Sequence, residues 1–134
     1  VTSYFKQAAM SGLILQFAYN YTDNNRQKLA KYKTLKELTD YLGKQNVVEQ
    51  FASYADKHGL QRRNLMIRKS HKMLSRFINS RIIYGMLDDE VWTQYLNEDD
   101  PVIAATLKVF KDNAAFPKLT QADKTKAEPK PKRK

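Results

Sequence analysis

The side chains best placed for acid–base or nucleophilic chemistry are His58 and His71, with Ser70 and Ser75 near the second histidine. A serine within hydrogen-bonding distance of a histidine can act as a nucleophile. Adjacent residues of a helix point about 100° apart, however, and neither serine lies in a glycine-flanked turn of the nucleophile-elbow type. We therefore interpret His71 as a partly buried structural residue and His58 as a residue that favours the end of a helix.

The sequence contains no pattern that would hold a metal ion or a cofactor. It has no HExxH sequence, no histidine pair four residues apart, no calcium-binding loop and no glycine-rich phosphate loop. The absence of cysteine excludes disulfides, thiolate ligands and cysteine nucleophiles. Two acidic clusters, at residues 88–90 and 98–100, fall where helices are expected to begin, and carboxylates there favour the helix dipole. We expect no cofactor, no metal ion and no catalytic activity from this chain alone.

The net charge of +10 is distributed unevenly along the 134 residues. The last 18 residues carry seven basic and two acidic side chains, which is half of the net charge. Their end is rich in lysine and proline and cannot bury enough apolar surface to offset the entropy of ordering. We therefore expect a helical domain over residues 1–116 and a disordered basic tail over residues 117–134. The tail could be a solvated terminus or an arm that binds nucleic acid or an anionic surface.

Apolar residues at helical spacing run through most of the first 110 residues, and no alternating stretch of four or more predicts a strand. The pattern predicts an all-α fold, a compact bundle of about six to seven helices. No apolar run is long enough to span a membrane. The expected helices cover about residues 3–20, a short segment after Asp23, residues 35–43, 47–58 and 61–86, a short segment after Asp88, and a last helix from Pro101.

Two glycines within these helices carry different expectations. Gly12 lies with Ala8 beside the apolar stripe of the first helix, where small residues would let another helix approach closely. Gly85 is expected to weaken or end the helix over residues 61–86.

Several residues are expected to begin or end helices. Thr34 and Glu37 form a capping-box pattern, in which each side chain accepts a hydrogen bond from a free backbone amide of the first turn. A glycine after the last turn, an aspartate before the first turn and a proline within it are also typical of helix ends. The expected structural caps are Thr34, Glu37, Gly59, Asp88, Asp100 and Pro101.

The helix over residues 61–86 carries basic residues that could bind an anionic partner. Lys69, Lys72 and Arg76 share one face because they are three and four residues apart. A basic helix with a basic tail is typical of nucleic-acid-binding proteins, but neither a helix-turn-helix form nor interleaved aromatic residues accompany it. A solvated face, or a face that docks on an acidic neighbouring domain, is at least as well supported. The candidate basic surface comprises Arg62, Lys69, Lys72 and Arg76.

The short helices contain more large aromatic residues than a thin bundle usually hides. Tyrosine and tryptophan are also enriched at protein interfaces. We therefore expect some of these residues to form an exposed patch that packs on another domain. The candidate interface comprises Tyr4, Tyr19, Tyr21, Trp92 and Tyr95.

Three segments resemble the C-terminal region of carboxyl-terminal processing (tail-specific) serine peptidases of the Bacteroides type: Ser3–Arg26, Phe51–Asn64 and Ile82–Phe110. An aromatic-rich first helix, a helix end of the form YA..KG and an N-x-DD-P sequence before a last amphipathic helix are characteristic of that family. Residues 54–59 (YADKHG) and 97–101 (NEDDP) match the latter two, with His58 where lysine is commoner. The resemblance covers about residues 3–112.

This resemblance implies a non-catalytic helical domain that packs on, or assembles, the protease core of a serine endopeptidase in the periplasm or cell envelope. In such peptidases a PDZ domain and a Ser-Lys catalytic core precede the helical extension. No segment here matches either, so no catalytic residue carries over. The implied partners are the protease core, the PDZ domain and, indirectly, protein substrates, with a homodimer as an open alternative. The start at Val1, without a methionine or a signal peptide, leads us to expect a fragment whose catalytic part lies upstream.

Overall fold

The computed structural model describes residues 1–97, 101 and 105–106, and every regular element among them is an α-helix. The all-α prediction is therefore confirmed for these residues. Asp100, most of the expected last helix and the expected tail lie outside the described residues. None of the described helices is long and apolar enough to cross a membrane. The helices are α1 (Ser3–Met10), α2 (Leu13–Asn24), α3 (Arg26–Leu29), α4 (Leu35–Gly43), α5 (Val47–Lys57), α6 (Asn64–Lys69), α7 (His71–Met86) and α8 (Asp89–Leu96).

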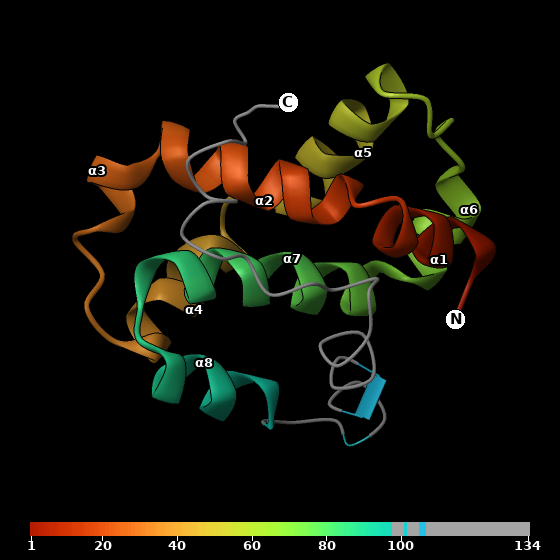
Figure 1. Cartoon of the computed structure of the whole chain (residues 1–134). Helices are drawn as coiled ribbons and strands as arrows, with labels where there is room; N and C mark the ends of the chain where they lie inside the picture. Colours follow the sequence, from red (N-terminus) through yellow and green to blue (C-terminus); the bar gives the residue numbers. More distant parts are fainter. Residues whose placement is uncertain (98–100, 102–104, 107–134) are drawn as a thin grey trace.

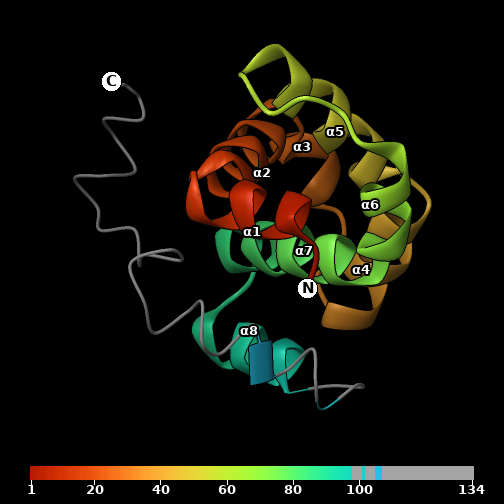
Figure 2. The same ribbon diagram turned by 90° about the vertical axis from the view of Figure 1, so that its right-hand side faces the viewer.

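Helix α7 runs through the middle of the bundle and contacts α2, α4, α5, α6 and α8. In Figure 1, α2 lies on one side of α7 and α8 on the other. Figure 2 shows α8 at the edge of the bundle, beyond α7. Helix α7 is buried around much of its circumference, as expected of a central helix. Its buried apolar residues are Leu74, Phe77, Ile78, Ile82 and Ile83.

The expected helix over residues 3–20 is two helices, because the chain breaks at Gly12. This residue has φ +85°, in the left-handed region, and precedes the first residue of α2. No atom lies within 4 Å of a Cβ placed on Gly12. The prediction of close helix approach at Gly12 is therefore wrong: the glycine is needed for its backbone conformation.

A second break, at Ser70, divides the expected helix over residues 61–86 into α6 and α7. The Ser70 hydroxyl forms a hydrogen bond of 2.6 Å with Oγ1 of Thr2. Thr2 also caps α1, because its Oγ1 accepts a hydrogen bond from the N–H of Phe5 at 3.1 Å. The end of α6 and the beginnings of α7 and α1 therefore meet at one hydrogen-bonded corner.

Gly85 is the second-to-last residue of α7, so the helix ends one residue after the glycine that was expected to weaken or end it. A Cβ at Gly85 would lie 3.4 Å from Cγ2 of Thr22 in α2. The missing side chain therefore lets α2 and α7 approach closely, which is the role that the sequence analysis gave to Gly12. Helix α7 continues to Met86.

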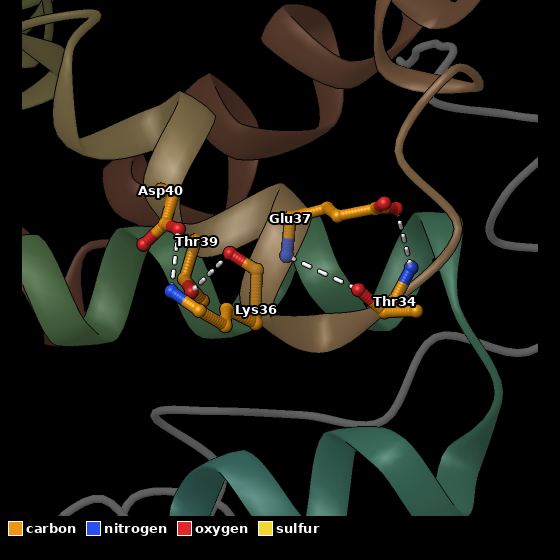
Figure 3. Close-up of polar contacts among 5 residues, drawn as sticks. All are labelled: Thr34, Lys36, Glu37, Thr39 and Asp40. Carbon is orange, nitrogen blue, oxygen red and sulfur yellow. Dashed lines mark hydrogen bonds and ion pairs between the residues drawn. The ribbon is translucent and has the colours of Figure 1, made fainter.

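Side-chain caps begin two of the later helices, and a glycine follows the end of another. Thr34 Oγ1 accepts from the N–H of Glu37 at 3.2 Å, and Glu37 Oε1 accepts from the N–H of Thr34 at 3.3 Å, which forms the capping box shown in Figure 3. Asp88 caps α8 by accepting from the N–H of Val91 at 2.9 Å. Gly59, just after the C-cap of α5, has φ +98°. Pro101 is helical and exposed.

Gly12, which is half-buried, and Gly43, which is exposed, offer a test of the backbone argument. Gly12→Ala is expected to lower the free energy of unfolding by about 1–2 kcal/mol, because alanine disfavours the left-handed region. Gly43 ends α4 without a positive φ and also has no neighbour within 4 Å of a Cβ. Gly43→Ala should therefore leave stability unchanged or raise it by up to about 1 kcal/mol. Urea unfolding of both variants measures the difference, and equal effects would contradict the assignment.

The capping box gives a second prediction. Thr34→Ala removes the oxygen that accepts from Glu37 N–H and should lower the free energy of unfolding by about 1 kcal/mol. Thr34→Ser keeps this acceptor and should retain most of the stability. Thermal unfolding followed by circular dichroism compares the two variants. If alanine and serine behaved alike, the hydrogen bond would have no measurable role.

Candidate functional site

A pocket of about 230 Å³ lies between α2 and α7. One wall comes from a stripe of α2, in which Leu15, Tyr19 and Thr22 are four and three residues apart and so share a face. The other wall comes from the last turns of α7, and the first residue of α3 completes the lining. The lining residues are Leu15, Tyr19, Thr22, Arg26, Arg81, Tyr84 and Gly85.

Arg81 is the buried charge of this pocket, with 6% of its surface exposed. It follows Leu74 by seven residues and Phe77 by four, so the helical period places it on the same face as two core residues. Its Cζ lies 4.5 Å from the centre of the Tyr84 ring, which is a cation–π contact. Burial lowers the pKa of the Arg81 guanidinium to about 10, although the nearby Tyr84 acts to raise it. The side chain therefore stays positively charged at neutral pH.

Thr22 faces the same pocket from α2 and is 4% exposed. Its Oγ1 is buried and has no hydrogen-bond partner among the described residues. A buried hydroxyl without a partner costs free energy that a bound polar group would recover. The absence of a side chain at Gly85 leaves Thr22 room beside α7.

Arg26 lies at the pocket from the first turn of α3 and is largely exposed. One of its guanidinium nitrogens lies 4.0 Å from Oδ1 of Asp23, and another lies 3.8 Å from Sδ of Met86. An exposed ion pair of this length contributes little to stability. Arg26 therefore adds positive charge near the pocket but is less tightly held than Arg81.

The pocket therefore combines a buried guanidinium, an unused hydroxyl and two tyrosine rings. A guanidinium binds a carboxylate through two parallel hydrogen bonds, whereas its high pKa excludes it as a general base at neutral pH. No group of three metal-ligating side chains occurs within the described part of the chain. This arrangement is suited to binding an anion.

The expected exposed aromatic patch does not form. Tyr4, Tyr21, Trp92 and Tyr95 are buried in the hydrophobic core, and Tyr19 is half-buried in the pocket wall. The physical reason is the size of the helices: α1 and α8 have eight residues each and need bulky rings to bury enough apolar surface. Burial accordingly raises the pKa of Tyr4 and of Tyr21.

The four residues of the candidate basic surface do not form one exposed basic patch, because Arg62 and Arg76 are half-buried. Arg62 donates to Oε1 of Glu49 at 2.5 Å and to Oδ1 of Asn64 at 2.6 Å. Arg76 donates to the carbonyl oxygen of Tyr95 at 2.8 Å, and its Cζ lies 4.0 Å from the centre of the Tyr95 ring. Lys69 and Lys72 are exposed. Two of the four cations thus hold the fold together, one between α5 and α6 and one between α7 and α8.

The pocket was not predicted from the sequence, although one residue gave a signal. Arg81 interrupts the apolar stripe of α7, and a charged residue at a core position is a typical mark of a functional site. The α2 wall carried no such signal, because leucine, tyrosine and threonine at helical spacing are equally typical of ordinary packing.

Comparison with known proteins places this helical domain in a family. Residues 4–88 match the model of a family of unknown function, DUF8443, and the match covers more than half of the chain. The chain belongs to this family. No curated protein and no solved structure gives a significant match.

Arg81 and Arg76 lie on the same helix and permit a matched stability test. Arg81→Met removes the cation–π contact with Tyr84, which lowers stability, and also removes the cost of burying a charge, which raises it. Because these effects oppose each other, the free energy of unfolding should stay within about 1 kcal/mol of the parent value. Arg76→Met loses the hydrogen bond to the Tyr95 carbonyl and the ring contact, and should cost about 2 kcal/mol. Chemical denaturation measures both variants. A large loss for Arg81→Met alone would show that Arg81 is mainly structural.

Proposed function

We propose that this chain is the non-catalytic helical domain of a carboxyl-terminal processing serine endopeptidase of the periplasm or cell envelope, where it packs on or assembles the protease core. The observation that carries the proposal is the packing of the segments that resemble that family. Phe17, in the first segment, has its ring centroid 5.6 Å from that of Phe51 and 5.5 Å from that of Tyr54, both in the second. The third segment begins within α7, which packs along α2.

The characteristic helix end of the second segment supports the same proposal. In YADKHG, Ala55 is buried, and its carbonyl oxygen accepts hydrogen bonds from the N–H groups of His58 and Leu60 at 2.9 Å each. The side chain of His58 stacks on Tyr54, with ring centroids 4.1 Å apart, and its Nδ1 lies 2.7 Å from the Tyr54 carbonyl oxygen. Through these contacts, the YADKHG sequence stabilises the end of α5. A motif with such a structural role is one that a non-catalytic domain would retain.

The docking surface for the protease core is proposed on α1 and α6. These two helices contact each other, and they carry two large exposed apolar residues, Met10 at 66% and Leu65 at 56% exposure. Val1, which precedes α1, is 70% exposed. In the family that the sequence resembles, the protease core precedes the helical domain in the chain, so the core would meet the bundle at this end. The proposal makes no use of the candidate basic surface, since Arg62 and Arg76 are engaged within the chain.

A peptidase assay of the parent enzyme tests the proposal. The isolated chain should cleave no peptide, and removal of residues 1–116 from the parent should reduce its activity or its assembly. Within the intact parent, the double variant Met10→Glu/Leu65→Glu should weaken the contact between the helical domain and the core by about tenfold, or about 1.4 kcal/mol. Limited proteolysis and size-exclusion chromatography would detect the loosened domain.

The matched control changes two exposed polar residues by the same total charge. Gln27→Glu/Gln94→Glu lies on α3 and α8, away from the proposed surface, and should behave like the parent. Equal effects of the two double variants would place the contact elsewhere on the bundle. A coding sequence without a Ser-Lys protease core ahead of Val1 would end the proposal altogether.

A further inference from the structure

We propose that the pocket between α2 and α7 binds a carboxylate group carried on an aromatic or aliphatic stem, with Arg81 as its charged ligand and Thr22 as its second hydrogen-bonding ligand. This inference does not depend on the proposed peptidase function. It rests on the cavity, on the buried guanidinium that borders it, and on the Thr22 hydroxyl that has no partner among the described residues.

The charge of the pocket selects the ligand. Arg81 is the single buried cation of the lining, because Arg26 is largely exposed and lies near Asp23. One buried positive charge is matched by a monoanion, whereas a phosphate dianion would leave an excess negative charge in a buried site. The planar guanidinium also fits a carboxylate with two parallel hydrogen bonds.

The shape and the lining select the rest of the ligand. A cavity of about 230 Å³ is smaller than typical sites for drug-sized ligands and holds a single small group. Leu15, Tyr19 and Tyr84 give it an apolar and aromatic wall, against which a ring or an aliphatic stem would pack. A free organic acid and the carboxyl end of a peptide share this chemistry.

Titration of the full chain, followed by ¹H–¹⁵N NMR, tests the proposal with four probes. Phenylacetate represents the free acid, and acetyl-Gly-Phe with a free carboxyl group represents the peptide end. Each is compared with its own C-terminal amide, which has nearly the same shape without the charge. We expect saturable shifts of the amides of Thr22, Arg81 and Gly85 with one or both acids, a Kd of about 1 mM for a ligand of this size, and at least tenfold weaker binding of the amides.

Each result of the titration has a defined meaning. Tighter binding of the peptide acid identifies a peptide end as the ligand, and tighter binding of phenylacetate identifies a small acid; both support the proposal. Equal binding of acids and amides would reduce the site to an apolar cavity and overturn it. No saturable shift up to about 50 mM would also overturn it, because affinity beyond that range is too weak to be specific. If inorganic phosphate bound more tightly than both acids in a parallel titration, the carboxylate proposal would be overturned.

Variants separate binding from folding. Thr22→Val removes the hydroxyl with little change of shape and should weaken acid binding by about threefold to tenfold without lowering stability, because Oγ1 has no partner to lose. Arg81→Met should abolish the preference for acid over amide. Arg63→Met removes the same charge from an exposed position outside the pocket and should leave binding unchanged. If Arg81→Met fails to fold, Thr22→Val still tests the proposal. Unchanged acid binding by Thr22→Val would contradict the role assigned to the Thr22 hydroxyl.

Discussion

The packing of α2 against α7 is the contact on which the rest of this structure depends. Helix α7 is buried along much of its circumference, and the two next longest helices, α2 and α5, both pack against it. The contact with α2 is close because residue 85 has no side chain and residue 22 is small. The same pair of helices also forms the walls of the pocket. The α2–α7 interface therefore forms both the centre of the core and the walls of the candidate binding site.

Helix type and order were largely predictable from the sequence, because apolar periodicity and capping residues act locally. Thr34 and Glu37 are three residues apart and need nothing beyond their own turn to form a capping box. The breaks at Gly12 and Ser70 were not predicted, since the apolar stripes on either side keep nearly the same period across each break. At the break between α6 and α7, the side chain of Ser70 forms a hydrogen bond with Thr2. Thr2 is 68 residues away in the sequence, so this contact leaves no trace in the apolar pattern around Ser70.

The candidate site was less predictable than the fold, and the two errors have a common cause. Tyrosine and tryptophan are typical both of cores and of interfaces, so Tyr4 and Trp92 could be assigned to either, and the small size of the bundle decided for the core. Arginine on a helix is usually solvated, so Arg81 was assigned no role from the sequence, although its spacing placed it among apolar residues. In both cases the side chain's environment depends on which helix covers it, and that is a property of the tertiary structure.

The corner where Thr2 bonds to Ser70 makes the first turn of the chain mechanically continuous with the central helix. From Ser70 to Arg81 the chain follows α7 for 11 residues, or about 16 Å along the helix axis. A packed helix transmits displacement along its axis more readily than it bends. The N-terminal end of the bundle and the arginine that borders the pocket are therefore joined by one hydrogen bond and about three turns of helix.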